Sequence, residues 1–184
     1  MTLEQQLQTL AEIGIQLNEA ITIDDLLYSW GREEYEKNPF DLVLFMLGSE
    51  VEREPWGRRI CDQAWNFDLE RIEDDGAYVE IIENLCRVAG MPGLITDLED
   101  SVDLENGEAW VRYTMDGQQR HHTVAVNNDW ADTDTVSAVM EAIERDGKRF
   151  YAKDNGQAAI WFYLDADTAA KLNQLTGNAL RASR

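Results

Sequence analysis

The chain has 184 residues, which fits one domain, and a formal net charge of -20, whereas small soluble domains commonly carry a magnitude of about 2 to 8. With 44% hydrophobic residues and six tryptophans, the composition is that of a protein with a packed core, which excludes a disordered acidic tail. The charge repels nucleic acid and anionic membranes and favours a basic partner, although solubility or adaptation to high salt would also account for it.

The first sixty residues are predicted to be helical. Thr2 and Gln5 have the spacing of a capping box, and leucines then follow at helical spacing. A second helix is expected to begin at Thr22 and to end near Gly31. The apolar run of residues 40–48 fits either a buried strand or a buried helix, and we favour the helix.

A strand and a helix are expected next. Trp65, Phe67 and Leu69 alternate with polar residues, which predicts a strand that is buried on one face. Residues 74–76, with the sequence DDG, then open a helix whose apolar positions recur at helical spacing until Gly90.

A three-stranded antiparallel meander follows. The pairs Asn106–Gly107 and Asp116–Gly117 each suit a two-residue hairpin turn. Counting outward from these turns places Val111 beside both Val102 and His122. These three residues then share the apolar side of the meander, and the other side is polar except for one tryptophan.

The remaining elements are a helix, a hairpin and a last helix. The first helix is capped by Asp132 or Asp134 and closed by Gly147. The hairpin arms flank Asn155 and Gly156, and the second arm is apolar on both faces, as expected of a central strand. The last helix spans 165–177.

This order of elements predicts an α+β fold, because it lacks the strict alternation of strands and helices typical of parallel sheets. We expect a single domain over residues 1–184, with a largely antiparallel sheet that contains the meander and is covered by helices. Its parts are an N-terminal helical part, residues 1–60, and an α+β core, residues 61–177. The N-terminus lacks a secretory signal pattern and the apolar runs are too short for a bilayer, so we expect a cytoplasmic protein.

The two histidines, His121 and His122, are adjacent on a predicted strand and should therefore point to opposite faces. We expect no metal ion held by both, and His122 is interpreted as a hydrogen-bonded core residue. The acids of residues 129–134 lack the glycine and the spacing of a calcium loop. Cys61 and Cys86 show no metal-type spacing and are expected to be reduced. No cofactor is expected.

No catalytic sequence motif occurs, so we expect a binding protein and not an enzyme. Acidic clusters next to aromatic residues are typical of an interface with a basic protein, because aromatic residues anchor and charges steer. The alternative is a solvated acidic face, with Trp130 packed in the core. The predicted partner-binding residues are Asp68, Glu70, Asp74, Asp75, Asp103, Trp110, Arg112, His121, Asp129, Trp130 and Asp132.

Two stretches resemble known proteins: WNFDLERIEDDGAYVEIIENL, residues 65–85, and VNNDW, residues 126–130. Both are similar to patterns in small acidic immunity proteins of bacterial polymorphic or contact-dependent toxin systems. The resemblance implies a protein that occludes the active site of a basic toxin, such as a nuclease that acts in the cytosol. Two alternatives stay open: a small acidic hydrolase with a cleft of carboxylates and a histidine, and a nucleic-acid mimic. The oligomeric state stays open too, a homodimer included.

Overall fold

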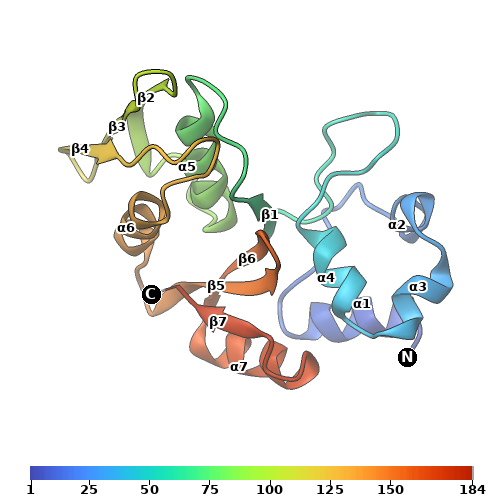
Figure 1. Cartoon of the computed structure of the whole chain (residues 1–184). Helices are drawn as coiled ribbons and strands as arrows, with labels where there is room; N and C mark the ends of the chain where they lie inside the picture. The colour runs from blue at the N-terminus through green and yellow to red at the C-terminus, as the bar shows by residue number, and fades with distance from the viewer. Residues whose placement is uncertain (184) are drawn as a thin grey trace.

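The computed structural model describes residues 1–183 and shows an α+β fold with two antiparallel sheets (Figure 1). The helices are α1 (Leu3–Glu12), α2 (Ile23–Ser29), α3 (Arg32–Lys37), α4 (Asp41–Leu47), α5 (Ala77–Val88), α6 (Thr133–Ile143) and α7 (Ala166–Leu175). The strands are β1 (Ala64–Asp68), β2 (Ile95–Asp103), β3 (Glu108–Met115), β4 (Gln118–Val124), β5 (Lys148–Asn155), β6 (Ala158–Asp165) and β7 (Leu180–Ala182). Within residues 1–183, no helix is long and apolar enough to cross a membrane.

A four-stranded sheet, in the order β1-β6-β5-β7, lies between two hydrophobic cores. Strand β6 is apolar on both faces, as predicted for a central strand. Ile160 and Phe162 pack into the core that contains α1–α4 and α7, whereas Tyr163 packs into the core that contains α5 and α6. Figure 1 shows these two groups of helices on opposite sides of the sheet. Residues 1–60 therefore share their core with β6 and α7, and the division into two parts stays a prediction.

The predicted N-terminal helices are confirmed, and the run 40–48 forms the helix α4. The backbone N–H of Thr2 donates to Gln5 Oε1 at 3.0 Å, and Thr2 Oγ1 accepts from the N–H of Gln5, which completes the capping box. Helix α3 was not predicted. The buried amide of Gln6 joins it to α1 and α4, donating to Tyr35 O at 2.9 Å and accepting from Phe40 N at 2.8 Å.

The meander has the order β2-β3-β4, and its second turn is confirmed. Met115 pairs with Gln118, so Asp116–Gly117 is a two-residue turn, and Val111 lies beside His122 as predicted. The chain leaves this sheet before α6, which Asp132 caps.

The predicted register of the first turn is wrong. Asp103 pairs with Glu108, which leaves a four-residue loop, and Val102 lies beside Ala109 instead of Val111. The Asp103 carboxylate accepts from the backbone N–H and the side-chain amide of Asn106, at 2.9 and 2.7 Å, and so stabilises the wider loop. Because the shift is by two residues, Val102 and Asp103 keep their predicted faces, whereas Leu104, predicted to pair with Ala109, lies in the loop.

A buried carboxylate fixes the loop of residues 52–58. Asp25 accepts hydrogen bonds from Thr22 N at 2.9 Å, Arg53 Nη2 at 2.7 Å and Arg58 Nη2 at 3.0 Å. Burial on its own would raise the pKa of Asp25, but the hydrogen bonds from Thr22 and the two arginines hold it far below the usual range of an aspartate. Asp25 therefore stays ionised and ties the loop to α2.

Replacement of Asp25 by Asn should destabilise the protein by about 3 kcal/mol at pH 7, because two guanidinium groups lose their carboxylate. The folded-state pKa of Asp25 is lowered, so its contribution is complete above the unfolded pKa of about 4 and is lost as the pH falls below it. Urea unfolding at pH 7 and pH 3 should show the difference from wild type shrinking at pH 3. Asp24→Asn, at the exposed neighbouring position, should change stability by less than about 0.5 kcal/mol at both pH values. An equal loss for both variants would contradict the role of Asp25.

Candidate partner-binding face

One side of the meander is uncovered, and we call it the outer face. Along β3 the inward residues Val111, Tyr113 and Met115 are buried in the core next to α5, whereas the alternating residues are half-buried or exposed. Figure 1 places the meander at one end of the molecule, with α5 beside it. The outer face comprises Glu99, Ser101, Asp103, Glu108, Trp110, Arg112, Thr114, Gln119, His121 and Thr123.

Trp110 lies at the centre of the outer face. The ring of His121 stacks on its indole with centroids 5.8 Å apart, and the Arg112 guanidinium carbon lies 5.3 Å from the indole centroid. Arg112 Nε donates to Glu99 at 3.1 Å. These contacts hold a half-buried tryptophan between polar groups, on a strand whose orientation is fixed by pairing on both sides.

His122 points to the inner side, as predicted. Its ring stacks on Tyr113 with centroids 5.7 Å apart, and Nε2 lies 3.3 Å from the Tyr113 hydroxyl oxygen. Burial lowers the pKa of His122, and the positive charges of Arg120 and His121 lower it further. In the part of the chain that the structure describes, no group of three or more His, Cys, Asp or Glu side chains could hold a metal ion.

Five predicted partner-binding carboxylates make hydrogen bonds within the fold, and three of them, Asp75, Asp103 and Asp132, hold the meander and the start of α6. Asp75 Oδ1 accepts from the N–H of Val102 at 2.6 Å, and Asp103 holds the loop before β3. Asp132 accepts from Thr135 Oγ1 at 2.7 Å and from the N–H of Ala125 at 3.1 Å. Substitution of these residues would therefore disturb local structure as well as surface charge.

A second group of predicted residues gathers where β1 ends. Gln157 Nε2 donates to Glu70 at 2.8 Å and to Asp68 at 3.4 Å. The backbones of Trp130 and Glu70 form an isolated antiparallel β-bridge. The backbone carbonyl of Asp129 accepts from Ile72 N at 2.8 Å. Of the eleven predicted residues, the outer face brings together only Asp103, Trp110, Arg112 and His121, and Asp74 is an exposed residue before α5.

A group of exposed aromatic residues was not predicted. Trp56 is 68% exposed in the loop that Asp25 fixes, and Tyr28 and Trp30 are exposed at the end of α2. The Arg53 guanidinium lies over the Tyr28 ring, 5.6 Å from its centroid. A sequence signal was present, because a tryptophan between Pro55 and Gly57 in a loop has no strand or helix face on which to be buried.

Comparison of the chain with protein-family models, with curated proteins and with solved structures gives no match. The two stretches that resemble immunity proteins have a structural role here. Trp65 and Phe67 are buried and stack with centroids 4.8 Å apart, and the helix that follows supplies core residues such as Ile81. The VNNDW stretch forms the turn before α6. Trp65, Phe67 and Ile81 therefore contribute to the core of the fold.

The imidazole of His122 should titrate below pH 6.5, the usual midpoint for histidine, and be neutral at pH 7. The measurement is an NMR titration of the two histidine rings, assigned with a His121→Gln variant. Arg120→Gln should raise the midpoint of His122, since it removes a positive charge that opposes protonation. A midpoint above 6.5 in the wild-type protein would show that His122 is not in the packed environment described here.

Proposed function

We propose that this protein is an immunity protein, which binds and inhibits a basic toxin in the cytoplasm without any turnover of its own. The observation that carries the proposal is Trp110, held between Arg112 and His121 on a sheet face that no helix of residues 1–183 covers, in a chain with a net charge of -20. Large aromatic residues near the centre of an interface supply most of the binding energy in many complexes.

Charge supports the same proposal. Glu105 and Glu108 are exposed in and beside the loop that leads into β3, so they lie at the loop end of the outer face. Acids around an aromatic anchor accelerate encounter with a basic protein, over a range set by the Debye length of about 8 Å at physiological salt. The anchor then governs dissociation, because its burial is lost when the complex separates.

Occlusion is the mode of inhibition that fits this geometry. A sheet face presents a firm, nearly flat surface, and a toxin domain that docks on it covers its own active site with β3 and β4. The hydrolase alternative, as defined above, requires a histidine and carboxylates in one cleft. His121 instead stacks on Trp110 on the open face, and His122 packs against Tyr113, so no specific arrangement of the histidines favours catalysis.

Two kinds of variant should change binding in different ways. Trp110→Ala should accelerate dissociation by about 30-fold, equivalent to about 2 kcal/mol, with little change in association. The double reversal Glu105→Lys with Glu108→Lys should slow association and reduce its dependence on salt. These acids suit the test because neither side chain makes a hydrogen bond within residues 1–183, unlike Asp75 and Asp103.

The measurement is stopped-flow binding to the purified product of the neighbouring gene across a salt series, with circular dichroism to check the fold of each variant. Trp56→Ala is the matched control, because it removes an exposed tryptophan away from the outer face. Faster dissociation for Trp56→Ala but not for Trp110→Ala would assign docking to the other aromatic surface. Absence of any complex would contradict the proposed function.

A further inference from the structure

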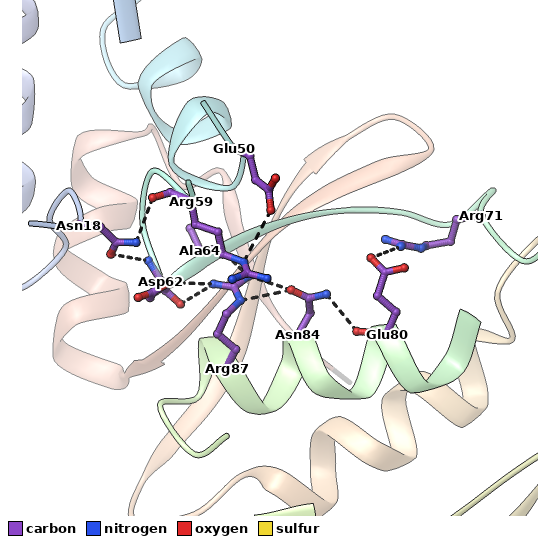
Figure 2. Close-up of polar contacts among 9 residues, drawn as sticks. All are labelled: Asn18, Glu50, Arg59, Asp62, Ala64, Arg71, Glu80, Asn84 and Arg87. Atoms are coloured by element: carbon purple, nitrogen blue, oxygen red, sulfur yellow. Dashed lines mark hydrogen bonds and ion pairs between the residues drawn. The ribbon is translucent and has the colours of Figure 1, made fainter. Parts of the chain in front are cut away.

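A polar pocket lies between the N-terminal helices and α5, in a region without predicted site residues. Its volume is about 120 Å³. Figure 2 shows Arg59, from the segment before β1, and Arg87, from α5, entering this space from opposite sides. Two acidic residues, Glu50 and Glu80, and the amide of Asn84 also line the pocket.

Arg87 supplies a buried positive charge. Its side chain is only 15% exposed, and its donors bind neutral oxygens: Asn84 Oδ1 at 3.2 Å, Asp62 O at 2.9 Å and Ala64 O at 3.3 Å. The carboxylate of Asp62 is exposed and lies 3.8 Å away. Burial lowers the pKa of Arg87, and the neighbouring charge of Arg59 lowers it further. Hydrogen bonds therefore hold this guanidinium in place while its charge is left only partly balanced.

Arg59 supplies free hydrogen-bond donors. Among residues 1–183, its side chain donates no hydrogen bond, and its ion-pair partner is the exposed Glu50, with Nε 3.9 Å from Oε1. That distance is too long for a hydrogen bond. A guanidinium group presents a planar fork of N–H groups that matches two oxygens of an oxyanion. Arg59 can therefore receive a ligand without losing a hydrogen bond within the protein.

Glu80, the second acidic residue that lines the pocket, already forms an ion pair with Arg71. Glu80 Oε1 lies 2.7 Å from Arg71 Nη2, on the side of the pocket away from Arg87 (Figure 2). Arg71 is mostly buried, and its guanidinium lies over the Trp65 ring, 5.6 Å from the centroid. The buried charge in the pocket is therefore that of Arg87, whose nearest carboxylate is exposed and 3.8 Å away, whereas the chain as a whole is strongly negative.

We propose that this pocket binds a phosphate group, with Arg59 as the bidentate donor and Arg87 as the fixed positive charge. The pocket is large enough for a phosphate group. Its volume of about 120 Å³ holds several water molecules, and a phosphate group has only five non-hydrogen atoms. Two guanidinium groups also match a dianion better than a singly charged carboxylate. The inference is independent of the proposed docking on the outer face.

The test is isothermal titration calorimetry of the full chain with inorganic phosphate at constant ionic strength, with acetate as a second probe. Phosphate should bind and acetate should bind at least about tenfold more weakly. Arg59→Gln should weaken phosphate binding about tenfold or more, because it removes charge-assisted hydrogen bonds. Glu50→Gln should tighten it, because it removes a competing carboxylate. Glycerol phosphate shows whether the ligand is a phosphate ester or free phosphate. Tighter binding of glycerol phosphate than of inorganic phosphate indicates an ester, and weaker binding indicates the free anion.

Arg32→Gln is the matched control, since its side chain is 43% exposed and that of Arg59 is 44% exposed, and it lies on α3 outside the pocket lining. It should change phosphate affinity less than twofold. Equal weakening by Arg32→Gln and Arg59→Gln would show general charge attraction and contradict the proposal. Absence of phosphate binding, or acetate binding as tight as phosphate, would also contradict it.

Discussion

The packing of apolar side chains on both faces of the four-stranded sheet is the constraint on which the rest of this structure depends. Strand β6 sends Phe162 toward the N-terminal helices and Tyr163 toward α5 and α6. Helix α5 must therefore cover this sheet with one side and contact the meander with another. Because the inner side of the meander packs into the core that contains α5 and α6, its outer face is the side that is left to solvent, and it carries the half-buried Trp110.

The acidic composition has two uses that the net charge alone does not separate. Some carboxylates stabilise the fold: Asp100 accepts from the N–H groups of Gly76, Tyr78 and Val79 at the start of α5, and Asp165 caps α7. Others, such as Glu105, are exposed and have no such bond. Both kinds contribute to the net charge of -20, but only substitution of the second kind changes the surface charge without removing a hydrogen bond of the fold.

Local patterns predicted the elements and part of the candidate site. The Asp116–Gly117 turn determines the register between β3 and β4, so its two-residue pattern was enough to place Arg112 opposite His121. The predicted register of the turn between β2 and β3 was wrong because Asp103 accepts hydrogen bonds from Asn106 and so stabilises a longer loop than the Asn–Gly pair suggests. Contacts between distant segments could not be predicted. The separation of the strands into two sheets, the contacts of Asp25 with Arg53 and Arg58, and the pocket between Arg59 and Arg87 all depend on residues that are far apart in the sequence. No short sequence pattern connects them.

Side-chain footprinting of the complex tests most directly whether the outer face is the docking surface. Hydroxyl radicals oxidise exposed aromatic and imidazole side chains, and the buried Trp65 serves as an internal reference. In a complex with the proposed partner, oxidation of Trp110 and His121 should fall strongly, while oxidation of Trp56 should be unchanged. Protection of Trp56 with unchanged Trp110 would contradict the central claim that the open side of the meander binds the partner.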